Sequence, residues 1–301
     1  MTTADIGKFV VTPAEVGVQN SQPLDSSRRK PGSRRNDEDD AEEARFARHW
    51  TVRDTLGVYL REAGFQFWGL VRMPGFALPT LLFPTMFYVF FGLIFAKSGD
   101  NQVAIYMLAT YGTFGIMAPA LFGFGVGVAM EREHGILAMK RVAPMPPMAY
   151  LFAKAAMAML FALVIALLLF VLGAVFAGVT LPRAQWFLLM VTLIIGTLPF
   201  CALGLAVGLR IGGQASAAII NVIYLPMSFL SGLWVPLQFF PHWLQEIARI
   251  FPAYHLGQIA LGIIHQGNAS GHFLTHMIYL IVFTAVCLWF AQRGWRRIQD
   301  R

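Results

Sequence analysis

Long apolar stretches separated by short polar ones dominate the chain from about residue 75 onward. Six of these stretches are long enough for a transmembrane helix, which needs roughly 20 apolar residues. They cover residues 75–96, 103–129, 150–178, 184–209, 214–235 and 273–292. Tryptophan and tyrosine residues near the ends of several stretches suit the two membrane interfaces. The pattern predicts an all-α, polytopic membrane protein with six transmembrane helices.

A different pattern precedes the first apolar stretch, between residues 51 and 73. Thr51 offers a helix N-cap with the acidic Asp54 three positions on, and apolar residues then recur at helical spacing. Aromatic residues such as Phe65 and Trp68 share the segment with several charged residues. We therefore predict an N-terminal amphipathic helix that lies in the membrane interface before the chain enters its first span.

Residues 1–50 contain no apolar run longer than a few residues, and they place a basic block before an acidic one. A segment of this composition cannot bury enough apolar surface to fold alone. We predict a disordered cytoplasmic tail over residues 1–50, the interfacial helix over 51–73 and a six-span transmembrane domain over 74–301.

Composition and charge place the chain in a membrane. Hydrophobic residues make up 57% of the sequence and charged residues 13%, whereas the charged share of a soluble domain is about a quarter. With both termini in the cytoplasm, 20 of the 23 basic residues lie on the cytoplasmic side and only Lys97, Arg183 and Arg249 lie on the other. The net charge of +7 therefore reflects topology and contact with anionic membrane lipid, and we expect no nucleic-acid partner.

Glycine patterns within the apolar stretches predict close helix packing rather than nucleotide binding. The sequence GFGVG at 123–127 and the repeat of Gly204, Gly208 and Gly212 lie at or within predicted spans, where small residues let helices approach closely. The sequence contains no G-x-x-x-x-G-K-[ST] loop. Any nucleotide energy must therefore come from another chain.

Candidates for catalysis or metal binding are sparse. His272 and His276 could share a helix face, but no carboxylate or thiol accompanies them, so a metal site is not predicted. Ser231 with His265 is a weak match to a serine protease, and Asn221 is the most central polar residue in a span. We expect no catalytic residue, no metal and no cofactor in this chain, and we expect that it is not an enzyme. A secondary transporter and a membrane-embedded enzyme are the alternatives.

The most charged break between apolar stretches reads EREHGILAMKRVAPMPPMAYLFAK, residues 131–154. This stretch resembles the cytoplasmic signature of type-2 ABC exporter permeases. The matching positions are Glu131, Glu133, Gly135, Leu137, Arg141, Ala143, Pro144 and Lys154.

A second block, residues 229–264, is similar to the external segment that precedes the last span of these permeases. Its matching positions include Pro236, Pro241, Trp243 and Pro252. The block departs from many relatives at residues 260–262, which read Ala-Leu-Gly where those relatives have an arginine. Its length and proline content predict short external helices before the last span rather than two further spans.

The resemblance implies a permease subunit of an ATP-driven ABC exporter in the bacterial cytoplasmic (inner) membrane, moving a drug, lipid, glycolipid or polysaccharide. A separate ABC ATP-binding subunit would bind ATP, and the permease would form a homodimer or a heterodimer. The residues implied in coupling to the ATPase, through a short coupling helix, are Glu131, Arg132, Glu133, Gly135, Leu137, Lys140 and Arg141. A cytoplasmic loop that only retains its positive charges is the alternative interpretation of this stretch.

The charge asymmetry predicts which positions are accessible from outside the cell. Single cysteines replacing Ser27 and Gln299 should be protected from a membrane-impermeant thiol reagent in intact cells, whereas a cysteine replacing Asn268 should react. Labelling at position 27 in sealed cells would reverse the predicted orientation.

Overall fold

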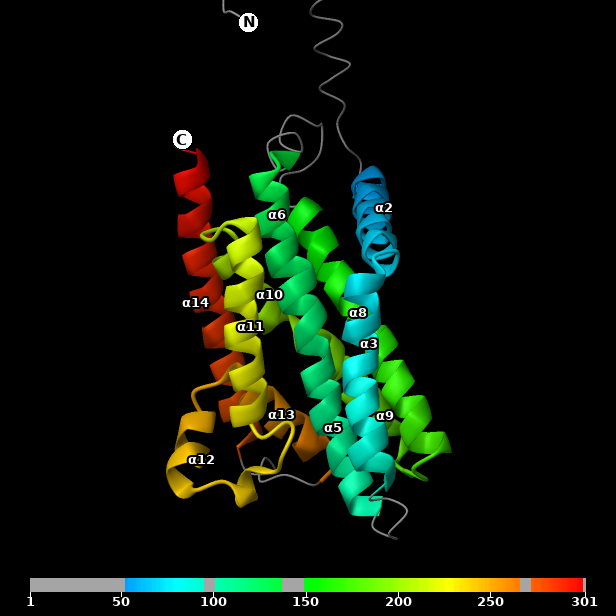
Figure 1. Cartoon of the computed structure of the whole chain (residues 1–301). Coiled ribbons are helices and arrows are strands. Elements are labelled where there is room, and N and C mark those ends of the chain that lie inside the picture. The colour runs from blue at the N-terminus through cyan, green and yellow to red at the C-terminus, as the bar shows by residue number, and fades with distance from the viewer. Residues whose placement is uncertain (1–51, 95–100, 137–148, 266–271, 300–301) are drawn as a thin grey trace, which may run out of the picture. The chain divides into compact units, whose positions relative to one another are not determined.

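The computed structural model describes residues 52–94, 101–136, 149–265 and 272–299, and every regular element in those ranges is a helix (Figure 1). Six helical stretches are long and apolar enough to cross a membrane. They cover Pro74–Leu93, Asn101–Glu133, Tyr150–Val175, Arg183–Gly208, Gly213–Leu230 and Phe273–Trp295. The predicted all-α class and the six spans are confirmed.

The six spans differ in how regular their helices are. The first comprises α3 (Pro74–Phe87) and a π-helical segment, η1 (Tyr88–Leu93). The second runs through α5 (Asn101–Ala118), the π-helical η2 (Pro119–Val126) and α6 (Gly127–Glu133). The third, fifth and sixth are α8 (Ala149–Val175), α11 (Gly213–Leu230) and α14 (Phe273–Gln299). Gly196 divides the fourth into α9 (Arg183–Ile195) and α10 (Thr197–Gly208).

Further helices lie before the first span and before the last. Helix α2 (Val52–Val71) packs on α8, and η3 (Leu237–Phe239), α12 (His242–Ala248) and α13 (Pro252–Ile263) follow the fifth span. Figure 1 shows α12 and α13 at one end of the spans, with α6 and the last residues of α14 at the other. Helix α13 packs against α5, α9 and α14. The predicted short helices before the last span are present.

The second span lies at the centre of the packed helices. Of its most apolar window, 72% is buried, against 17% for the last span. Proline explains its irregular middle: Pro119 begins η2, and a proline lacks the N–H and the space that a regular α-helix needs at that point. The second span is therefore the most buried of the six, and its helix is irregular near its middle.

Glycines bring the backbones of η2 and α10 into direct contact. A Cβ atom added to Gly125 would lie 2.7 Å from the Cα of Gly204, and one added to Gly208 would collide with the carbonyl oxygen of Gly125. No other residue leaves enough space for this approach. The sequence-based prediction of helix packing is confirmed for Gly204 and Gly208, whereas Gly212 lies beyond the end of α10 and is exposed.

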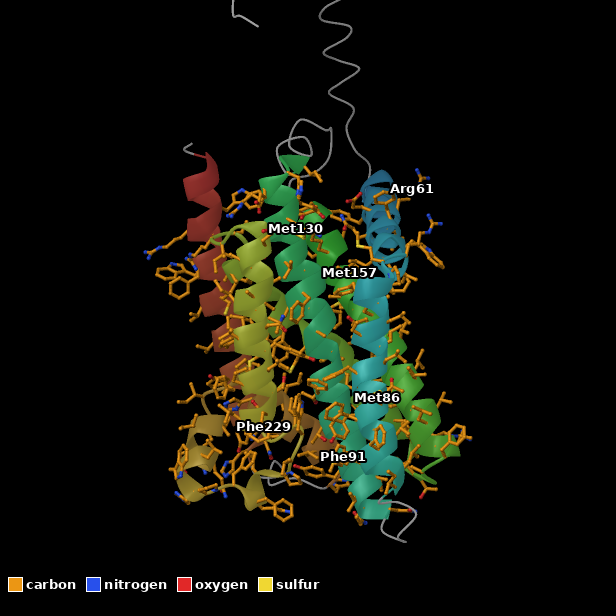
Figure 2. The ribbon with its side chains drawn as sticks, in the orientation of Figure 1. Arg61, Met86, Phe91, Met130, Met157 and Phe229 are labelled. Atoms are coloured by element: carbon orange, nitrogen blue, oxygen red, sulfur yellow. The ribbon has the colours of Figure 1, made fainter. Side chains whose placement is uncertain are left out.

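Aromatic side chains fill the space between the second and fifth spans. Phe114 stacks on Tyr224, with ring centroids 5.4 Å apart, and the indole of Trp234 meets Phe114 edge-on at 5.5 Å. Phe91 and Phe229, labelled in Figure 2, lie toward the same end of the spans. Aromatic pairs in these geometries add about 0.5–1.5 kcal/mol each beyond the burial of their area.

Helix α2 shows a buried face and an exposed face. Phe67 packs on Phe161 of α8, with ring centroids 5.0 Å apart, while Phe65 and Trp68 are 76% and 59% exposed. Its position in the membrane interface stays a prediction. The predicted tail, residues 1–50, lies outside the residues that the structure describes.

The glycine contact predicts a sharp difference between two small substitutions. Gly125→Ala should destabilise the protein by roughly 1–3 kcal/mol, because the added methyl group forces η2 away from α10. Gly69→Ala is the matched control, since nothing lies within 4 Å of a Cβ there; alanine should stabilise this helix by about 0.5–1 kcal/mol. Thermal unfolding in detergent measures both, and equal stability of the two variants would contradict the contact.

Candidate functional site

Three consecutive charged residues, Glu131, Arg132 and Glu133, occupy the last turn of α6. We call them, with the partners described below, the α6 junction. Successive residues of an α-helix point about 100° apart, so the three side chains leave the helix in different directions. Each one reaches a different helix end.

Glu131 joins the end of the second span to the start of the third. Its Oε1 lies 2.9 Å from Nζ of Lys154, and its Oε2 accepts a hydrogen bond of 2.6 Å from the hydroxyl of Tyr150. The Lys154 side chain is only 2% exposed, and its ammonium group lies 5.4 Å from the centroid of the Tyr150 ring. A buried ammonium group is costly unless an anion and further contacts accompany it, and this arrangement provides both.

Arg132 binds the end of α10. Its guanidinium group donates to the carbonyl oxygen of Leu209 and, at 2.8 Å, to that of Ile211. The last carbonyl groups of a helix have no partner within the helix, and they form the negative end of its dipole. Arg132 therefore satisfies acceptors that α10 leaves open and places a positive charge where the dipole favours one.

Glu133 binds the beginning of α11. Its carboxylate accepts a hydrogen bond from the backbone N–H of Gly213, the first residue of that helix. A carboxylate is favoured at a helix N-terminus for the same two reasons, open donors and a positive dipole end. A Cβ atom on Gly213 would lie 2.6 Å from the Glu133 carboxylate. Glycine at this position therefore makes room for the contact.

The helix ends immediately after these contacts. The backbone N–H of His134 donates to the carbonyl of Met130 at 3.0 Å, and the His134 side chain is exposed. Gly135 has a φ of +73°, a conformation that glycine adopts without strain and most other residues do not. The backbone therefore turns sharply away from the helix axis at Gly135.

The structure brings three of the sequence-predicted coupling residues, Glu131, Arg132 and Glu133, into one cluster and places Gly135 at its edge. Leu137, Lys140 and Arg141 lie outside the described residues. Sequence reasoning missed Tyr150 and Gly213 as partners of the cluster. The pairs that join them to α6 are 19 and 80 residues apart in the sequence, and no local pattern signals such distant pairs.

Proline residues begin the elements of the external segment. Pro236 precedes η3, Pro241 precedes α12, and Pro252 is the first residue of α13, positions where a missing backbone N–H costs nothing. Trp243 is 64% exposed. In the described structure these residues shape the segment, and they do not converge on a site.

The other sequence candidates do not assemble into catalytic or metal sites within the described ranges. No three His, Cys, Asp or Glu residues come close enough to hold a metal ion among them. His272 is exposed, while His276 is buried and contacts His255 of α13. The buried hydroxyl of Ser231 has no hydrogen-bond partner among the described residues. Ser231 is therefore not paired with a base in the described structure.

An apolar cavity of about 460 Å³ lies where α9, α10, α13 and α14 meet. Thr192 and Thr284 are the only hydroxyl-bearing residues in its lining, which contains no charged residue. Thr284 donates its hydroxyl to the carbonyl of Leu280, one turn earlier in the same helix. The cavity therefore offers space but no group suited to acid–base or nucleophilic chemistry.

Comparison with known proteins identifies the family of the chain. A family model described as ABC-2 family transporter protein matches residues 96–292. The chain belongs to the ABC-2 transporter family. The match begins just before the second span and ends within the last, so it includes the α6 junction and the external segment.

A bacterial relative supports the same assignment of the permease. The protein named "Putative transport permease YvfS", from Bacillus subtilis strain 168, is 27% identical over 217 residues. The aligned region covers 71% of the permease and 89% of the relative. The resemblance to type-2 ABC permeases is confirmed, and the chain is a multi-pass transport subunit rather than an enzyme. Members of this family generally work with an ATP-binding subunit.

The buried and exposed ion pairs of the permease should respond differently to the same substitution. Glu131→Gln removes the charge that lies beside buried Lys154, and it should lower stability by about 2 kcal/mol. Glu246→Gln is the control, because the Glu246–Arg249 pair at 3.1 Å is exposed and such pairs contribute about 0–1 kcal/mol. Thermal unfolding in detergent compares them. An equal loss in both would show that Glu131 does not hold α6 to α8.

Proposed function

We propose that the permease is the membrane-spanning subunit of an ATP-driven exporter in the bacterial cytoplasmic membrane. The α6 junction is the observation that supports this function best. A chain without a nucleotide-binding motif can use ATP only if a partner moves its helices, and that partner needs a firmly attached point of contact. In our proposal the partner subunit binds ATP and contacts the permease at the stretch that follows Gly135.

The contacts of the α6 junction explain how such a movement would spread. Displacing α6 pulls on α8 through Glu131 and on the turn between α10 and α11 through Arg132 and Glu133. Hydrogen bonds that involve a charged group are shorter and stronger than neutral ones. The ends of the second, third, fourth and fifth spans therefore move together, which is what alternating access requires.

The orientation follows from the distribution of charge. If both termini share the side of the α6 junction, 20 of the 23 basic residues belong to that side, and short cytoplasmic loops retain basic residues. We propose that this side and both termini are cytoplasmic. Acidic and basic residues within the described spans lie near the span ends, which favours an external energy source over an ion-coupled transporter, whose carboxylates lie deep in the membrane.

A dimer of permeases completes the proposal. Asn221 lies in the middle of α11 and is exposed, as are the neighbouring Val222 and Leu225. An amide facing lipid is unfavourable, whereas small and polar residues commonly form hydrogen bonds between packed membrane helices. We propose that the exposed face of α11 contacts a second permease subunit, identical or homologous.

The proposed cargo is a drug, a lipid, a glycolipid or a polysaccharide, and we expect it to be at least partly apolar. The aromatic cluster around Phe114, Tyr224 and Trp234 supports this class, because aromatic rings stack on apolar and cyclic groups. Phe87 and Phe91 extend it toward the exposed side of the first span. Stimulation of ATP hydrolysis by candidate substrates tests the class in the purified complex.

Coupling is tested by variants in the α6 junction, assayed as a complex with the ATP-binding subunit that co-purifies with the permease. Glu133→Lys reverses the charge at the start of α11, and Gly135→Pro is incompatible with a φ of +73°. Each should reduce substrate-stimulated hydrolysis by at least about fivefold. Insertion into the membrane should be unaffected, because neither residue lies within the apolar part of a span.

Gly135→Asn is the matched control, since asparagine tolerates positive φ better than other side chains, and it should retain most activity. Co-purification of the ATPase, measured alongside hydrolysis, separates lost docking from lost transmission. If Glu133→Lys and Gly135→Pro both bind the ATPase and transport normally, the stretch is only a loop that retains its charges.

A further inference from the structure

Two buried histidines join the external segment to the last span. His255 of α13 and His276 of α14 are 6% and 8% exposed, and their Nδ1 atoms lie 2.7 Å apart. A hydrogen bond between two imidazoles needs an N–H on one ring and a lone pair on the other. The contact therefore depends on the protonation state of both residues.

A second hydrogen bond determines which ring donates. The Nε2 atom of His255 lies 2.9 Å from the carbonyl oxygen of Arg249, and a carbonyl can only accept, so Nε2 carries the hydrogen. In neutral His255 the Nδ1 atom is then the acceptor. His276 consequently donates from its own Nδ1.

Tyr279 strengthens the same attachment. Its ring stacks on that of His255 with centroids 3.7 Å apart, and its hydroxyl donates to the carbonyl of Ile250. Residues of α14 thus hold both the first turn of α13 and the backbone that leads into it. The histidine pair is the central contact of this attachment.

The groups around the pair offer no anion within the described contacts. From α13 and α14, Tyr254 and Tyr279 face the rings, and the exposed His272 lies one turn before His276. The charged groups of the α12 region are His242, Glu246 and Arg249, and Glu246 is paired with the other two. The titratable residues of α5 and α9, which also pack on α13, are Tyr106, Tyr111 and Arg183.

We propose that the His255–His276 pair is a proton-binding site. When both rings are neutral, their hydrogen bond holds α13 against the last span, and when both rings are protonated this hydrogen bond is lost. A first proton can bind at Nε2 of His276 and leave the hydrogen bond in place. A second must bind at Nδ1 of His255, which is the acceptor. Two N–H groups and two positive charges then face each other at 2.7 Å, and the contact separates.

Burial acts in the same direction. It lowers the pKa of His255 below its usual value, against a smaller opposing effect from the Arg249 carbonyl. A histidine whose pKa is lowered by folding stabilises the fold fully above about pH 6.5 and loses this contribution as the pH falls below that value. Acid therefore weakens the attachment of α13.

The source of the protons rests on the proposed orientation, in which α13 lies on the outer side of the membrane. Acidification outside the cell would then loosen the external segment without any change in the cytoplasm. The proton-binding site itself does not depend on the exporter function, and it can be tested with purified permease alone.

The test is thermal unfolding of the full-length permease in detergent between about pH 7.5 and about pH 5.5. The Tm of the unmodified protein should fall by about 2–4 °C across this range. His276→Gln keeps a neutral donor, and its amide oxygen can accept a hydrogen bond once Nδ1 of His255 is protonated. The contact then survives acid, so the Tm of this variant should lose most of the dependence. His272→Gln is the control, because this residue is exposed and one turn away on the same helix, and it should behave like the unmodified protein.

Hydrogen exchange of the unmodified permease provides a second measurement that does not depend on the variant folding. After correction for the intrinsic effect of pH, peptides covering 249–264 and 272–283 should exchange several-fold faster at the lower pH, and peptides from α8 should not. Unchanged exchange in both peptides, or a His276→Gln variant with the full pH dependence, would overturn the proposal.

Discussion

The contact between the backbones of η2 and α10 is the constraint on which the rest of the permease depends. Glycines at 125, 204 and 208 allow the second and fourth spans to touch without intervening side chains. In a bilayer, lipid tails are as apolar as the helices, so close packing rather than water exclusion holds helices together. The α6 junction lies directly beyond this contact, and its charged side chains reach their partners because the two backbones are already close.

The α6 junction and the external segment are fixed by different physics at opposite ends of the spans. At the α6 junction, charged side chains form hydrogen bonds with backbone groups that helix ends leave unpaired. Arg132 donates to carbonyl oxygens at the end of α10, and Glu133 accepts from the N–H at the start of α11. In the external segment, prolines begin the elements, and a histidine pair joins α13 to α14. In our proposal the second arrangement depends on the protonation of its two imidazoles, whereas no histidine is among the contacts that define the first.

Much of the architecture could be predicted from the sequence because it depends on local patterns. Apolar length determined the six spans to within a few residues, and the length and proline content of residues 229–264 indicated short external helices there. The break at Gly196 was not predicted, because the apolar run continues through it. A Cβ atom on Gly196 would meet Leu256 at 2.6 Å, so the requirement for glycine at this position comes from another helix.

The α6 junction was predicted only in part, because its partners also lie on other helices. The resemblance to type-2 permeases indicated Glu131, Arg132 and Glu133, but the residues they bind could not be read from their neighbours. Tyr150 and Gly213 become partners only when the helices pack. The His255–His276 contact was also missed, because the sequence analysis compared His276 with His272 on its own helix rather than with α13.

The order of the three charged residues in α6 restricts insertions and deletions in this helix. Because adjacent positions point about 100° apart, inserting or deleting one codon between Gly127 and Glu131 would turn each side chain toward its neighbour's partner. Arg132 would then face a helix start and a glutamate a helix end, both electrostatically unfavourable. This restriction ends with the helix itself, which stops at Glu133 before the turn at Gly135. Helix geometry therefore restricts the number of residues in α6 that precede this charged turn.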